Sequence, residues 1–179
     1  MGADTGFDNL RLDTDPVTLR EIVGDPLRLR EILHSVRDAI DSTGSQDRTE
    51  LSRLYGQQSV LLRLLEDLDE ALAAARLSLR YTGDDPALVT VAGIRLANVH
   101  QCRGEYRAAD GIYAQVLAGA PDGYRSFAAL HAGKSRYEQG DAEAAVRHFE
   151  GAVRLRSTGP PDLLAAAEQA LAAARQLKA

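Results

Sequence analysis

The amino-acid sequence predicts an all-α fold in which antiparallel helix pairs stack side by side into an α-solenoid. The 179 residues are 45% hydrophobic but only 5% aromatic, without Trp, and the strong helix formers Ala and Leu supply most of the apolar side chains. No stretch sustains the alternation of apolar and polar residues that a strand requires. Glycine and proline recur at regular intervals, and one pattern of residues repeats along the chain.

The N-terminal part divides into a tail and a helical segment. Residues 1–15 are polar and acidic with no apolar period, so we expect a flexible tail there. Residues 16–46 are expected to be helical, because Pro16 and Pro26 each follow an Asp that can cap a helix. This predicts a short helix from Pro16 and a longer one from Pro26 to about residue 42. Apolar residues follow Pro26 at helical spacing, namely Leu29, Ile32, Leu33, Val36 and Ile40.

Residues 47–179 are expected to form one helical-repeat domain. Gly104 and Gly140 divide the intervening segments into helix pairs, and the stretch from Pro161 has no partner, which predicts a C-terminal capping helix. Three breaks combine a helix stop with a new helix start: Gly83–Pro86, Gly119–Pro121 and Gly159–Pro161.

A pattern of small and aromatic residues occurs twice, 36 positions apart: Gly104 corresponds to Gly140, Ala109 to Ala145, and Tyr113 to Phe149. A weaker copy lies upstream, with Ala71 and Ala75 in the same frame. Closely packed helices need small residues where their axes approach, and an aromatic four residues after Ala lies on the same helix face. One pair cannot bury its own apolar face, so the pairs are expected to stack.

These residues resemble the tetratricopeptide repeat family over about residues 50–157. The second repeat matches the family pattern at Leu96-Ala97, Gly104-Glu105-Tyr106, Ala109, Tyr113 and Pro121. The third matches it at Gly133, Gly140-Asp141, Ala145, Phe149 and Ala152. The first is degenerate, because Glu66 and Asp67 replace the glycine turn and Ala75 replaces the aromatic. The resemblance implies about three repeats in a right-handed solenoid.

Charge, hydropathy and cysteine content exclude several classes of protein. The formal net charge of -5 argues against a nucleic-acid partner, which requires a basic surface. No apolar stretch approaches the roughly 18 residues of a membrane span, and the N-terminus lacks a secretory signal pattern. The single cysteine, Cys102, builds no disulfide framework and fits a reduced, cytoplasmic setting. All basic residues except Lys134 and Lys178 are Arg, which indicates a GC-rich, bacterial source.

No arrangement of residues indicates an enzyme. Residues 131–135 end in Gly-Lys-Ser like a phosphate-binding loop, but Ala128 stands where the first glycine belongs and the surroundings predict helix. His100 and Cys102 are two positions apart and therefore point in different directions on a helix. The carboxylates near Glu66 are typical of a solvated turn. We expect no catalytic residue, no cofactor and no metal.

The resemblance implies that ligands lie on the concave face formed by the first helix of each pair. Arg53 and Arg63 make this face basic on an acidic protein, which suits an acidic peptide or a carboxylate. The family's carboxylate clamp is matched only in part, so chaperone binding is not implied. The repeat phase places ten candidate contacts on the face: Gln57, Val91, Ile94, Arg95, Asn98, Gln101, Phe127, His131, Lys134 and Tyr137.

These features predict a non-enzymatic interaction module that binds a protein or peptide partner on its concave face, an acidic partner by preference. The alternative is a regulatory sensor that binds a signal peptide or small effector and controls a partner regulator. The concave face is either a solvated polar surface or covered by the N-terminal helices. Those helices are candidates for an autoinhibitory element, an extra degenerate repeat or a homodimer contact.

Overall fold

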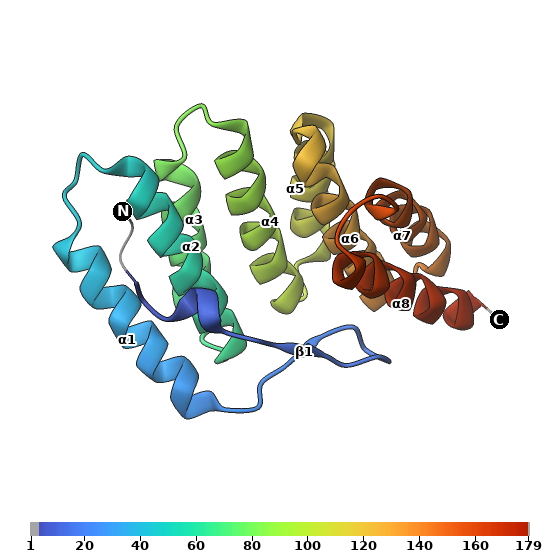
Figure 1. Ribbon diagram of the computed structural model, residues 1–179, viewed down its shortest axis with the longest axis horizontal. Helices are drawn as coiled ribbons and strands as arrows, with labels where there is room; N and C mark the ends of the chain where they lie inside the picture. The colour runs from blue at the N-terminus through green and yellow to red at the C-terminus, as the bar shows by residue number, and fades with distance from the viewer. Residues whose placement is uncertain (1–3, 179) are drawn as a thin grey trace.

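The computed structural model describes residues 4–178, with side chains described as far as Leu177. Within this range consecutive α-helices pack antiparallel into a solenoid, which confirms the predicted all-α fold class (Figure 1). The helices are α1 Pro26–Ser42, α2 Arg48–Leu64, α3 Leu68–Tyr81, α4 Pro86–Cys102, α5 Tyr106–Gly119, α6 Asp122–Glu138, α7 Ala142–Arg156 and α8 Pro161–Lys178.

Aspartates begin four of the helices, as the sequence suggests. The carboxylate of Asp25 accepts a hydrogen bond from the amide of Arg28 at the start of α1, and Asp47, Asp85 and Asp141 cap α2, α4 and α7 in the same way. Inside the second and third pairs, Gly104 and Gly140 turn the chain with φ of 74° and 77°. Glu66 adopts the same left-handed conformation in the first pair, with φ of 65°. The degenerate first repeat therefore keeps the turn geometry without the glycine.

Small residues allow the paired helices to approach, as predicted. A Cβ added to Gly133 would lie 2.5 Å from Cε1 of Phe149, so the ring of Phe149 occupies the space of the missing side chain. Ala145 and Ala152 beside this ring are fully buried. Tyr113 occupies the corresponding position one repeat earlier, where it packs with Ala97 and Ala132.

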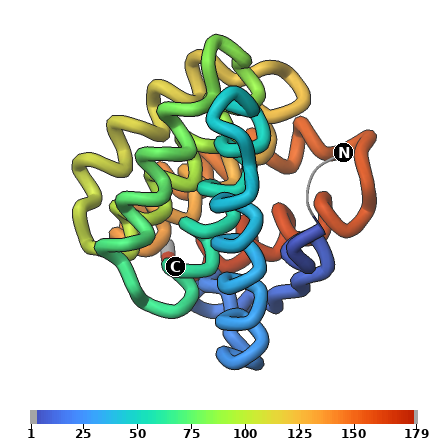
Figure 2. Tube along the Cα trace, turned by 90° about the vertical axis from the view of Figure 1, so that its left-hand side faces the viewer, coloured from blue at the N-terminus to red at the C-terminus, as the bar shows by residue number. Residues whose placement is uncertain are grey.

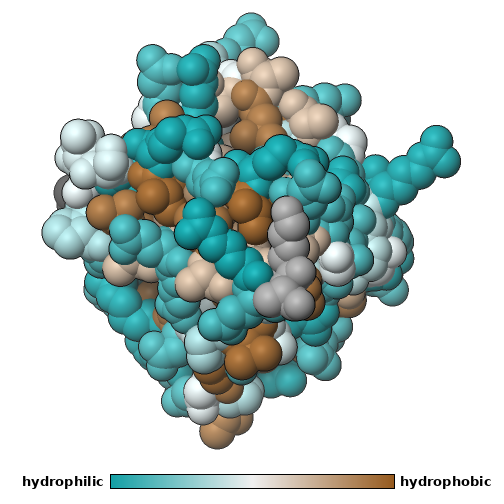
Figure 3. Space-filling model, turned by 90° about the vertical axis from the view of Figure 1, so that its right-hand side faces the viewer, coloured by the Kyte–Doolittle hydropathy of each residue, from teal (hydrophilic) through white to brown (hydrophobic). Residues whose placement is uncertain are grey.

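The last helix, α8, covers the apolar face of α7. Its alanines join Phe149 and Ala152 in one buried cluster with Leu171. Figure 3 views this end of the solenoid, where apolar side chains form separate patches divided by hydrophilic ones. The arrangement agrees with the predicted capping helix. Among the described residues, no helix has the length and apolar character that crossing a membrane requires.

The predicted short helix from Pro16 is wrong. This stretch is a small antiparallel hairpin, in which β1 (Asp13–Thr14) pairs with β2 (Glu21–Ile22). The side chain of Asp15 accepts hydrogen bonds from the amides of Val17 and Thr18 at 2.8 and 2.7 Å, which closes a turn in place of a helix cap. An Asp-Pro pair begins either structure, so the local signal was ambiguous.

The predicted tail is also corrected for the part that the structure describes. Thr5 is buried, and Phe7 begins a short 3-10 helix (Phe7–Asn9). The side chain of Phe7 packs against the core formed by α1, α2, α3 and α4. Met1–Ala3 lie outside the described residues. Residues 4–24, called the N-terminal arm from here on, run from beside α1 and α2 toward α6 and α8 (Figures 1 and 2).

Candidate functional site

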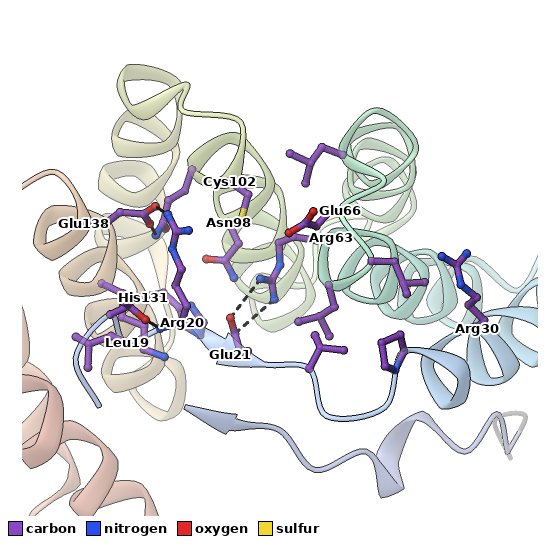
Figure 4. A pocket seen from close by; sticks show the side chains of 18 residues that line it. Leu19, Arg20, Glu21, Arg30, Arg63, Glu66, Asn98, Cys102, His131 and Glu138 are labelled. Atoms are coloured by element: carbon purple, nitrogen blue, oxygen red, sulfur yellow. Dashed lines mark hydrogen bonds and ion pairs between the residues drawn. The ribbon is translucent and has the colours of Figure 1, made fainter. Parts of the chain in front are cut away.

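A cavity of about 750 Å³ lies between the N-terminal arm and the predicted concave face (Figure 4). The first helix of each pair contributes to it: Arg63 comes from α2, Asn98 from α4 and Lys134 from α6. The arm lines it from the other side with Leu19, Arg20 and Glu21. The solenoid therefore does form a shared face from α2, α4 and α6, and this face is covered by the arm.

Four of the ten predicted contacts line this cavity, namely Asn98, Gln101, His131 and Lys134. Gln57 is buried beneath the arm, where its Oε1 accepts a hydrogen bond from Oγ1 of Thr5 at 3.1 Å. Phe127 and Tyr137 are half-buried on α6, and Val91 is half-buried on α4. Ile94 is 0% exposed and packs with Val116 and Ala128. Ile94 is thus a core residue and not a contact for a partner, because its side chain faces the neighbouring helices.

The arm places one carboxylate against the basic face. Nη1 and Nη2 of Arg63 lie 3.3 and 3.4 Å from the two carboxylate oxygens of Glu21. The side chains of Arg63 and Glu21 are only 9% and 25% exposed. Burial alone would raise the pKa of Glu21, but Arg63 and Lys134 outweigh it and hold the pKa at about 2. Glu21 is therefore an anion at neutral pH, paired with Arg63 and further stabilised by the charge of Lys134.

Lys134 and His131 lie one helical turn apart and face the same cavity. Burial lowers the pKa of Lys134, and Arg63 and Arg156 lower it further, while Glu21 opposes them. Burial and the charge of Lys134 lower the pKa of His131 to about 3, so its ring is neutral at pH 7. The ring packs edge-on against Phe127 at a centroid distance of 4.5 Å. Neither side chain has a hydrogen bond to any described residue.

Tyr113 orients the two amides of α4. Its hydroxyl donates to Oδ1 of Asn98 at 2.5 Å and lies 3.1 Å from Oε1 of Gln101. Nε2 of Gln101 donates to the carboxylate of Glu138. With its oxygen engaged by Tyr113, Asn98 is left with its amide NH₂ as a donor toward the cavity, where Figure 4 shows the side chain between Arg63 and Arg20.

Two further contacts hold the arm to α6. Arg20 forms an ion pair with Glu138, and Oη of Tyr137 donates to the backbone carbonyl of Val17 at 2.7 Å. Leu19, between them, is 4% exposed and joins the apolar cluster of α6, α7 and α8. Tyr137 thus binds a backbone carbonyl in the turn of the chain's own hairpin.

Arg95 lies apart from the cavity. A Cβ added to Gly56 would lie 1.9 Å from Nη1 of Arg95, so the guanidinium occupies the space beside this glycine. Burial and the charge of Arg53 lower the pKa of Arg95 to about 10, and Asp8 of the arm acts in the opposite direction. The basic residues predicted on the concave face therefore lie in two places. Arg63 and Lys134 line the cavity, and Arg95 lies beside Gly56.

The sequence interpretation missed the arm residues Leu19, Arg20 and Glu21. The predicted helix from Pro16 includes them, and the local sign to the contrary is the Asp-Pro turn pair before β-branched Val17 and Thr18. Tyr113 was expected in the core, and no sequence signal identifies its hydroxyl as the partner of Asn98.

No protein-family model and no curated protein matches the chain. Among solved structures, the chain is similar to BtubC (BKLC) from P. vanneervenii, with a TM-score of 0.62 and 16% sequence identity. The match covers 85% of this chain and 74% of that chain. At this identity the likeness concerns the fold alone, and it supports a helical-repeat architecture.

Proposed function

We propose that the three helix pairs α2–α3, α4–α5 and α6–α7 are tetratricopeptide-type repeats, and that their shared face binds an extended, acidic segment of a partner protein. The observation that carries this proposal is that the face already holds a backbone segment, the hairpin of the chain's own arm. The carboxylate of Glu21 lies on Arg63, and the carbonyl of Val17 on Tyr137. These are the kinds of contact by which a groove recognises a peptide.

Charge supports an acidic partner. Arg63 has Glu21 as its counter-ion, whereas Lys134 has no carboxylate within ion-pair distance among the described residues. The amide of Asn98 adds a neutral donor on the same wall of the cavity. A second carboxylate would therefore meet unused donors, and charge-assisted hydrogen bonds of this kind contribute about 1.5–3 kcal/mol each. The lone thiol of Cys102 and the Arg-rich composition support a cytoplasmic, bacterial setting.

A peptide-display selection tests this function. Random decapeptides are selected on the full-length protein, both as the wild type and as Glu21→Gln, which weakens the hold of the arm. Acidic peptides are expected to be enriched, and Lys134→Glu should weaken their binding about tenfold or more in fluorescence anisotropy. Arg147→Glu on α7 is the matched control, because its side chain is 65% exposed and lies outside the cavity. Equal effects of the two substitutions would reject this face as the binding site.

A small-effector sensor is the second candidate, favoured by the cavity itself. Its volume of about 750 Å³ lies within the range of small-molecule sites, roughly 300–1,000 Å³. Thermal melts with a panel of small carboxylates and phosphates distinguish this candidate. A rise in melting temperature that Lys134→Met abolishes, together with no selected peptide, would favour the sensor.

A further inference from the structure

The arm segment from Asp13 to Ile22 makes three chemically different kinds of contact with the shared face of α2, α4 and α6, called the groove from here on. Its backbone is bound by Tyr137, an aliphatic side chain is buried at Leu19, and a carboxylate is neutralised at Glu21. Leu19 directly follows the turn of the hairpin, and Glu21 begins β2, so both anchors come from the stretch that returns toward α1. Figure 4 shows both in the lining of the cavity, Leu19 near His131 and Glu21 near Arg63.

The backbone of Leu19 adopts an unfavourable conformation. It has φ of 59°, a left-handed conformation that is unfavourable for an L-residue with a bulky side chain. Such a conformation persists only where the surroundings determine it, and here the side chain lies among Ala129, Leu130 and Leu171. Leu19 is therefore an anchor whose burial outweighs local backbone preference.

The hairpin has little structure of its own to hold it in place. Its strands pair at only two positions, Asp13 with Ile22 and Thr14 with Glu21. Isolated hairpins of this size are marginal in water. The link to α1 passes through Gly24, where an added Cβ would meet no atom within 4 Å. Contacts with the groove, more than pairing within the hairpin, therefore keep this segment in position.

We propose that residues 13–22 are a tethered competitor for the groove, and that the partner segment which replaces them carries an aliphatic side chain two residues before a carboxylate. This rests on the proposed function and adds to it the ligand pattern and its regulation. A tethered segment acts at an effective concentration in the millimolar range, so it excludes weak ligands and admits those that reproduce both anchors. The free donors of Lys134 and Asn98 give a partner segment an additional contact that the arm does not use.

Binding of a labelled peptide of residues 13–22 to the full-length protein tests the proposal. The variant Leu19→Ala/Glu21→Gln removes both anchors from the arm but leaves the groove unchanged. The peptide is expected to bind this variant at least tenfold more tightly than it binds the wild type in fluorescence anisotropy. Leu27→Ala/Glu31→Gln makes the same chemical changes at exposed positions of α1 and should bind like the wild type. Circular dichroism melts verify that each variant is folded.

Peptide variants identify the anchors. The Leu19→Ala/Glu21→Gln protein is called the released variant. Replacing Leu19 by Ala or Glu21 by Gln in the peptide should each reduce the affinity of the peptide for this variant about tenfold. Equal affinity of the peptide for wild type and released variant would overturn the competitor role, and so would a wild-type dimer held by exchanged arms in sedimentation. Selected peptides that depend on Lys134 but lack the aliphatic–acidic spacing would overturn this inference while leaving the proposed function intact.

Discussion

At the residue scale, the groove is a small set of ionisable side chains in which burial and charge act together. Glu21 stays charged because Arg63 and Lys134 outweigh its burial, whereas His131 becomes neutral because burial and Lys134 act in the same direction. The same cavity therefore contains a carboxylate that resists protonation and an imidazole that resists it as well. Both shifts make the folded protein bind fewer protons than the unfolded chain at mildly acidic pH.

His131 should make stability depend on pH. Its pKa is about 3 in the folded protein against 6.5 when unperturbed, so its contribution is fully present above pH 6.5 and is lost as the pH falls toward 3. Between pH 7 and 5, His131 should account for a loss of about 1–2 kcal/mol of unfolding free energy. Urea titrations of His131→Gln should show a correspondingly smaller loss. His34→Gln, at a 79% exposed position, is the control and should lose as much unfolding free energy between pH 7 and 5 as the wild type. The same loss in His131→Gln as in the wild type would contradict the assigned burial of His131.

At the element scale, the helices follow from periodicity and capping, and the paired helices follow from small residues opposite aromatic ones. Gly133 and Phe149 show this most directly, because the ring fills the place of the absent Cβ. The hairpin shows the opposite case. The sequence from Asp15 is compatible with a helix start. The turn closed by Asp15 forms instead, because Leu19 and Glu21 then gain contacts with α6 and α2 that a helix at this place would not give them.

Gly133 and Phe149 should be energetically coupled. Phe149→Ala should cost about 3–5 kcal/mol in unfolding free energy, since it empties a fully buried position. Gly133→Ala should cost about 1–3 kcal/mol, since its Cβ would lie 2.5 Å from the ring. In the double variant the two costs should not add, because the small side chain fills space that the ring has left. Gly123→Ala, also on α6 but with no atom within 4 Å, serves as the control and should change stability little. Additive costs would show that the two residues do not touch.

At the scale of the whole molecule, the chain consists of a solenoid of packed helices and an arm whose hairpin has few contacts of its own. The solenoid shares one continuous series of packed helices, whereas the hairpin of the arm is held by Leu19, Glu21 and a few polar contacts. Regions with few buried apolar contacts open locally, without unfolding of the rest. An acidic protein thus covers part of its own basic face with its N-terminal arm.

The arm should open below the global unfolding transition. The backbone amides of Asp15 and Leu19 are bonded only within the hairpin, and we expect them to exchange hydrogen by local opening. In hydrogen-exchange mass spectrometry, low concentrations of urea should accelerate exchange in α4 but leave the arm peptides almost unchanged, because local opening exposes little surface. The same urea dependence in the arm and α4 would show that the arm unfolds only with the whole solenoid.

Local patterns in this chain are sufficient to specify the helices, the paired packing and the phase of the shared face. Helix periods, Asp-Pro starts and glycine turns act over a few residues, and for that reason the repeat phase places Asn98, Gln101, His131 and Lys134 on one cavity. The path of the arm was decided only by tertiary structure. Leu19 and Glu21 find their partners more than forty positions away, on α6 and α2, and contacts at that separation leave no periodic trace in the sequence. The burial of Leu19 and the pairing of Glu21 with Arg63 outweigh the helical preference of the neighbouring residues, and neither contact can be recognised from the local sequence.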